Sequence, residues 1–121
     1  MTVDTARQAA ELLAPHLAAR EGESVAVLHL DSARRLIDIS FAETNATGLP
    51  VRDILAAALR LGADAVIVGL GRPTGDAMPR EADRADARRL ADAAVALGVR
   101  LTDLFIFAGD DCHSFRELGL L

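Results

Sequence analysis

The spacing of hydrophobic residues switches back and forth between the helix period and the strand period along this chain. Apolar residues three or four positions apart predict amphipathic helices. These helices are expected over residues 4–20, 51–62 and 80–97. Because Pro15 lacks the N–H that an interior helical bond needs, the first helix is expected to end or kink near Ala14.

Short apolar runs lie between these helices, and they predict strands over residues 24–30, 36–43, 65–68 and 99–107. The first two strands are separated by turn residues, which predicts a β-hairpin whose second strand places Ile37, Ile39 and Phe41 on one face. A loop rich in glycine and proline is expected over residues 71–79. This order of elements predicts an α/β fold with helices packed on a sheet.

Composition bounds the class of protein. With 121 residues, 51% of them hydrophobic, we predict one domain over residues 1–121 that includes an N-terminal helix within residues 1–20. The net charge of −5, and four Phe without Tyr or Trp, disfavour nucleic-acid binding. Short, interrupted apolar runs predict no membrane association. The single cysteine cannot form an intramolecular disulfide, which fits the cytoplasmic location that we expect.

The third predicted helix carries a carboxylate on its apolar face. Its stripe consists of Asp83, Ala87, Leu90, Ala94 and Leu97, so Asp83 should point toward the sheet. An acid in the first turn also complements the helix dipole without any further role, and that interpretation stays open. One continuous core is expected to include Ile54, Leu55, Val66, Ile67, Leu90, Leu97, Phe105 and Ile106.

Residues 70–83 form the most specific motif, Leu70-Gly71-Arg72-Pro73-Thr74-Gly75-Asp76-Ala77-Met78-Pro79-Arg80-Glu81-Ala82-Asp83. This register resembles the loop His-x-His-Pro-Ser-Gly-Asp-Pro-x-Pro-Ser-x-x-Asp of the RadC-like branch of the JAB/MPN (JAMM) metallopeptidases. Residues 97–103 and 114–121 resemble the ending of the same family. The resemblance covers residues 24–121 and implies a JAB/MPN-type, cytidine-deaminase-like fold, a mixed β-sheet sandwiched by helices.

The departures from the family pattern fall on its reactive positions. The resemblance implies that two histidines and the final aspartate bind zinc, and Leu70 and Arg72 stand where those histidines would be. Leucine offers no donor atom and arginine is a permanent cation, so we expect neither zinc nor another cofactor here, with Asp83 as a vestigial ligand position. The family's general base is a glutamate from the early strands. Glu43 is the candidate, and a solvent-facing strand end is the alternative interpretation.

Two other motifs give weaker evidence for a functional site. Residues 69–75 resemble a phosphate-cradling glycine loop, but their glycine spacing is wrong. Cys112 and His113 are neighbours in sequence and are expected to lie exposed on a turn rather than to act as nucleophile and base.

The resulting hypothesis is a catalytically inactive domain that binds a protein partner or assembles with itself. The alternative is a metal-dependent hydrolase, of the JAMM peptidase or isopeptidase type, that has rebuilt a metal site from Asp76, Asp83, Glu43 and His113. In the inactive case a buried Asp83 needs a new cation. Arg72 is predicted to fill the vacated site and pair with Asp83, and Asp76 is a second possible acceptor.

Overall fold

The computed structural model describes residues 1–44, 48–73 and 75–121. Helices and strands are interspersed along the chain, as the hydrophobic spacing predicts. In order, the elements are α1 (Ala6–Ala18), β1 (Ser24–Leu30), β2 (Leu36–Ala42), α2 (Val51–Leu61), β3 (Ala65–Arg72), α3 (Glu81–Ala96), β4 (Arg100–Ala108) and β5 (Asp111–Ser114). In this part of the chain, no helix has both the length and the apolar character that a membrane crossing requires.

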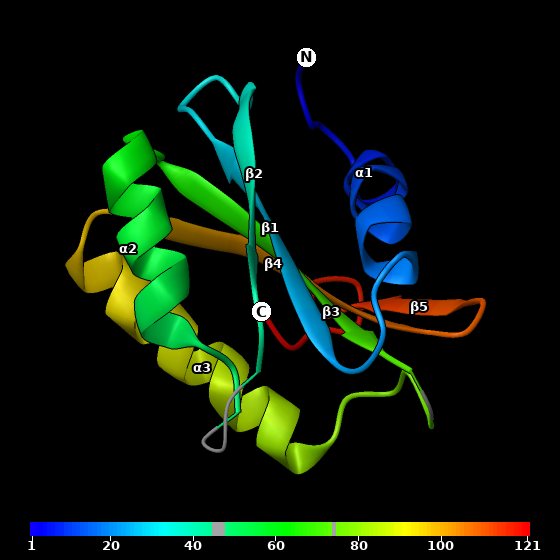
Figure 1. Cartoon of the computed structure of the whole chain (residues 1–121). Coiled ribbons are helices and arrows are strands. Elements are labelled where there is room, and N and C mark those ends of the chain that lie inside the picture. The colour runs from blue at the N-terminus through cyan, green and yellow to red at the C-terminus, as the bar shows by residue number, and fades with distance from the viewer. Residues whose placement is uncertain (45–47, 74) are drawn as a thin grey trace.

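The strands form one mixed sheet in the order β2-β1-β3-β4-β5. Strands β3 and β4 pair in parallel, and the other neighbours pair antiparallel. Figure 1 looks onto the β2 edge of this sheet, with α2 and α3 on one side and α1 on the other. The predicted architecture, a mixed sheet sandwiched by helices, is therefore confirmed.

The predicted continuous core is wrong, because the sheet divides the buried apolar residues into two clusters. The cluster under α2 and α3 contains Ile54, Leu90 and Ile106. The cluster under α1 contains Ile67 and Phe105, whose side chains leave the opposite face of the same strands. Leu97 joins neither cluster, because it caps the end of α3 and is 47% exposed.

Helix α1 is continuous through Pro15, so the predicted end of the helix near Ala14 is wrong. Pro15 is exposed, and the carbonyl that loses its helical partner can be hydrated on that side of the helix. On the other side, Leu13 and Leu17 are buried against the sheet. Tertiary packing therefore outweighs the local cost of the proline.

Strand β3 continues to Arg72, four residues beyond its predicted end. Gly69 and Gly71 lie within the strand. A Cβ atom at Gly69 would lie 3.0 Å from Leu17 Cδ1, and a Cβ atom at Gly71 would lie 3.3 Å from Leu17 Cβ. These glycines let α1 approach the sheet closely, which is a packing role rather than a loop role. The phosphate-cradling interpretation fails for the same reason.

Strand β5 was not predicted, and it contains the two neighbours that were expected on a turn. Cys112 pairs with Phe107 and His113 pairs with Ile106, so β5 forms a short hairpin with β4. Successive side chains on a strand point to opposite faces. Cys112 and His113 are thus directed apart, as the argument against a nucleophile and base pair requires.

Strand β2 has an irregular start. His29 pairs with Asp38 and Leu30 pairs with Leu36, which leaves Ile37 as a bulge. Regular alternation holds from Asp38 to Ala42, so Ile39 and Phe41 share one face as predicted, and the bulged Ile37 lies outside this alternation. This irregularity ends the regular edge of the sheet near Asp38.

Candidate functional site

A buried ion pair lies where β3 ends and α3 begins. Arg72 is the last residue of β3, and Asp83 lies in the first turn of α3. The Arg72 Nη2 donates to Asp83 Oδ1, and the two side chains are only 4% and 10% exposed. The predicted pairing of Arg72 with Asp83 is therefore confirmed.

The second oxygen of Asp83 is engaged as well. Asp83 Oδ2 accepts a hydrogen bond of 2.7 Å from the backbone N–H of Arg80, the residue that precedes α3. This bond satisfies one of the free donors at the helix start, and the charge lies at the positive end of the helix dipole. Asp83 therefore serves both the ion pair and the helix end.

Asp76 takes part through its main chain only. The Arg72 Nη1 donates to the Asp76 carbonyl oxygen at 3.4 Å. The Asp76 carboxylate instead accepts from the Met78 N–H at 2.9 Å, and the residue is exposed. The suggested pairing of its carboxylate with Arg72 is wrong, because the carboxylate closes a local turn.

The other described residues of the loop do not add donor atoms around Arg72. Leu70 is buried in the apolar cluster under α2 and α3. Pro73 is exposed, and Gly75 holds a φ of +97°, a conformation that favours glycine. Thr74 lies outside the described residues.

The residues present do not fit the zinc ion that the resemblance implies. A catalytic zinc site needs about three nitrogen, sulfur or oxygen ligands around one point. Here one position is an aliphatic side chain, the second is a guanidinium, and both oxygens of the third are bonded to Arg72 and Arg80. The arrangement can hold a strand end and a helix start together, but its donors do not suit a divalent cation.

Glu43 lies just past the end of β2 and is exposed. The residues that share its parity face α1, since Ile39 packs in the cluster under that helix. Arg72 and Asp83 lie on the opposite face with Leu70. In the described part of the chain, no hydrogen bond or ion pair joins Glu43 to either residue of the pair. Its role as a vestigial base stays a prediction.

The carboxylate site of the alternative hypothesis is not assembled. His113 lies on β5 at the far side of β4, Asp76 points into its own turn, and Asp83 is held by Arg72. Among residues 1–44, 48–73 and 75–121, no group of three or more His, Cys, Asp or Glu side chains is placed to hold one metal ion.

A second buried carboxylate, Asp103 of β4, was not predicted as a structural centre. Its Oδ1 accepts from the backbone N–H groups of Leu104 at 2.8 Å and Arg116 at 3.0 Å. Its Oδ2 accepts from Ser114 Oγ at 2.5 Å. This network fastens the C-terminal segment to β4 and joins two motifs, residues 97–103 and 114–121, that the sequence shows only as separate.

Two further polar groups have shifted pKa values. His29 is fully buried on β1, with its Nε2 2.7 Å from Ser40 Oγ on β2. Burial lowers the pKa of His29, Asp38 opposes this shift, and Arg60 adds to it. Burial raises the pKa of the Cys112 thiol to about 11, with further contributions from Asp103 and Glu117, so this cysteine is a poor nucleophile at neutral pH.

Comparison with known proteins agrees with the loop and the fold. The sequence model described as "RadC-like JAB domain" matches residues 3–120 of the chain. The chain is 36% identical to the UPF0758 protein YkfG of Escherichia coli K12, over 92% of this chain and 72% of that protein. It is 39% identical to a UPF0758 protein of Vibrio cholerae, over 87% of this chain and 68% of the relative. It is 33% identical to the UPF0758 protein STH371 of Symbiobacterium thermophilum, where it spans 49% of that protein's length.

Proposed function

Because the chain belongs to the RadC-like JAB domain family, we propose that it is a catalytically inert member that serves as a protein-binding or assembly module. The observation that carries this proposal is the Arg72–Asp83 pair at the position of the family's metal loop. A permanent cation occupies the place of a neutral ligand, and the remaining carboxylate is fully engaged.

The buried pair would hold the start and the end of the loop together without a metal. A lone buried Asp83 would cost several kcal/mol, and the guanidinium removes that cost while it ties β3 to α3. The loop then acts as part of the scaffold. Protein binding is the function left to such a scaffold, as the resemblance implies for inactive members of the wider family.

The experiment compares zinc affinity in the natural protein and in the double variant Leu70→His, Arg72→His by chelator competition. We expect no zinc binding by the natural protein. The double variant should gain measurable affinity, because Asp83 is then released from Arg72 and three ligands are present. The single variant Arg72→His is the matched control and should bind more weakly than the double variant.

Stoichiometric zinc, or peptidase or isopeptidase activity, in the natural protein would contradict the inert assignment. Magnesium and manganese belong in the same titration, since they suit the carboxylate set of the hydrolase alternative.

A further inference from the structure

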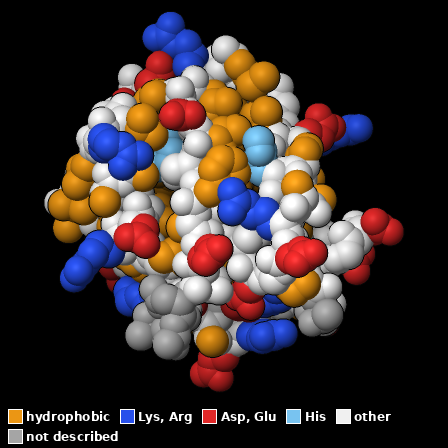
Figure 2. Space-filling view, in the orientation of Figure 1, with side chains coloured by type: hydrophobic (Ala, Val, Ile, Leu, Met, Phe, Trp, Pro, Cys, Tyr) orange, Lys and Arg blue, Asp and Glu red, His pale blue; other side chains and the backbone are white. Residues whose placement is uncertain are grey.

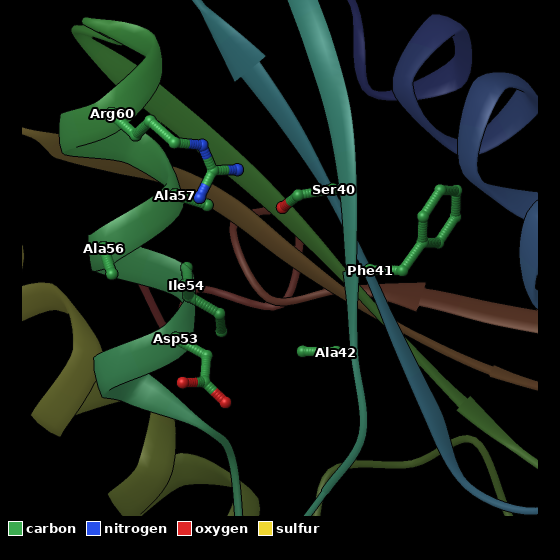
Figure 3. Close-up of a pocket in the computed structure, with 8 residues that line it drawn as sticks. All are labelled: Ser40, Phe41, Ala42, Asp53, Ile54, Ala56, Ala57 and Arg60. Atoms are coloured by element: carbon green, nitrogen blue, oxygen red, sulfur yellow. The ribbon is translucent and has the colours of Figure 1, made fainter.

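A groove runs between the outer edge of β2 and helix α2. It has a volume of about 290 Å³, and Ser40, Ala42, Asp53, Ala56, Ala57 and Arg60 contribute to its lining. Figure 3 shows Ser40 and Ala42 directed toward α2, whereas Phe41 points away from the groove toward α1. The groove therefore has a sheet edge on one side and a helix on the other.

The β2 side of the groove is an edge strand. At its start, the Leu36 N–H donates to the Met1 carbonyl oxygen, but no other described strand pairs with the outer edge of residues 38–42. Its outward N–H and C=O groups are a template for one more strand. The regular stretch from Asp38 to Ala42 offers five residues of edge, and the bulge at Ile37 ends it. An added strand therefore has a defined stopping point beside Asp38.

On the α2 side, small side chains line the middle of the groove and a charged side chain lies at each end. Ala56 and Ala57 leave room for a backbone to approach, while Asp53 and Arg60 lie at opposite ends. Both charged residues are exposed, and neither takes part in an ion pair within the described ranges. The positive end lies beside Ser40, toward the bulge, and the negative end lies beside Ala42.

The spacing of these charges selects a particular peptide. Asp53 and Arg60 are seven positions apart on the helix, which is about 10 Å along its axis, and this equals about three residues of an extended chain. A chain that ends at the bulge presents its terminal carboxylate to Arg60. Its residue three positions earlier then lies beside Asp53, where a lysine or arginine is complementary. This direction is antiparallel to β2.

Side chains on the α1 side of the added strand would meet Phe41 of β2. Phe41 is 43% exposed on the α1 side of β2, where Arg20 and His16 contact only part of its ring. Figure 2 shows hydrophobic side chains exposed along the middle of this face of the molecule. Apolar residues at the last and third-last positions of the peptide would cover Phe41, since alternate side chains leave the strand on opposite sides.

We propose that the groove between β2 and α2 binds the extended C-terminal end of a partner protein as an added antiparallel strand, with its carboxylate at Arg60 and a basic residue at Asp53. This inference rests on the proposed protein-binding function and names the surface and the class of partner. It does not depend on the state of the metal loop.

The test uses fluorescence anisotropy with a dye-labelled Gly-Lys-Val-Ser-Val peptide that carries a free carboxyl end. The matched probe is the same peptide with an amidated end. We expect saturable binding of the free acid and about tenfold weaker binding of the amide. The Arg60→Gln variant should weaken binding of the free acid by a similar factor, so that the two probes bind with equal affinity. Arg88→Gln, on the exposed face of α3, should leave the preference intact.

The Asp53→Asn variant tests the other end of the groove. It should remove the preference of the protein for lysine over glutamine at the second position of the probe, without removing the preference for the free acid. Asp92→Asn on α3 serves as the matched control. All four substituted side chains are exposed, so the variants should fold, and circular dichroism verifies this.

Absence of saturable binding up to about 1 mM peptide overturns the proposal. Equal binding of acid and amide by the natural protein also overturns it, as does an Arg60→Gln variant that keeps the preference. Concentration-dependent self-association that excludes the peptide would assign the edge to a second copy and overturn it as well. None of these outcomes affects the zinc titration, so failure here is distinguishable from failure of the inert assignment.

Discussion

At the scale of single residues, Arg72 and Asp83 depend on each other. Each side chain carries a full charge, each is almost completely buried, and the Arg72 Nε has no hydrogen-bond partner in the part of the chain that the structure describes. Such a pair adds little net stability over apolar packing, but removing one member strands the other. The pair is therefore better tested by what its loss costs than by what its presence adds.

The Arg72→Ala variant should lose about 1–3 kcal/mol of unfolding free energy, because Asp83 would remain buried without its cation. Chemical denaturation measures this loss. Arg88→Ala removes the same charge from an exposed site and should change stability by less than about 0.5 kcal/mol. Equal losses of unfolding free energy in the two variants would show that the pair contributes nothing to stability. In a double-mutant cycle, Asp83→Ala should cost less when Arg72 is already absent.

His29 should make stability depend on pH. Burial lowers its pKa in the folded state, so between that pKa and about 6.5 the unfolded chain binds a proton that the folded chain does not. The contribution of His29 to stability is complete above about pH 6.5 and is lost progressively as the pH falls below that value.

Measuring the unfolding free energy between about pH 5.5 and 7.5 checks this dependence. In the His29→Gln variant, whose side chain does not titrate, the slope below about pH 6.5 should shrink. An unchanged slope would assign the pH dependence to other groups.

At the scale of helices and strands, periodicity predicted which elements exist but not all of their limits. Helix α2 and the β1–β2 hairpin follow directly from apolar spacing and turn residues. The continuity of α1 through Pro15, the length of β3 and the existence of β5 depend on packing between distant segments. Glycines in β3 carry a loop signal in sequence, although their role is to admit α1.

The same distinction applies to the candidate site. The Arg72–Asp83 pair could be predicted because both residues belong to one motif with a known register. The bonds from Asp103 to Ser114 and from His29 to Ser40 cross between strands, and nothing in local sequence indicates them. Only the sheet pairing brings those side chains together.

Helix α3 provides a matched test of which face is buried. Leu90 is 0% exposed and Leu97 is 47% exposed, although both lie on the stripe that predicted the core. Leu90→Ala should destabilise the protein by about 2–5 kcal/mol, since burial and cavity terms add. Leu97→Ala should cost less than about 0.5 kcal/mol in the same denaturation experiment. Similar losses would mean that the end of α3 is buried by a contact within a larger assembly.

At the scale of the whole molecule, the sheet separates two apolar clusters made of different buried residues. Ile67 belongs to the cluster under α1, and Ile106 belongs to the cluster under α2 and α3. Changes on the two faces should therefore act independently. The face that holds the Arg72–Asp83 pair can vary without disturbing the packing of α1.

Ile67→Val and Ile106→Val should each cost about 0.5–1.5 kcal/mol, and the double variant should equal their sum within about 0.5 kcal/mol. Unfolding free energies of the three variants test this additivity. A coupling above about 1 kcal/mol would show that the sheet transmits strain from one face to the other.

The network at Asp103 bears on how the chain matures on the ribosome. Translation adds Asp103 before Ser114 and Arg116, the residues that satisfy two of its hydrogen bonds. Until those residues emerge, docking β4 fully would trap a carboxylate without its partners, which costs several kcal/mol. We therefore expect a chain truncated before Ser114 to hold β4 less firmly and to be cleaved by a protease faster than the full sequence. The segment that follows β4 thus helps decide how firmly this strand docks, because it supplies two of the three hydrogen bonds that Asp103 accepts from the described residues.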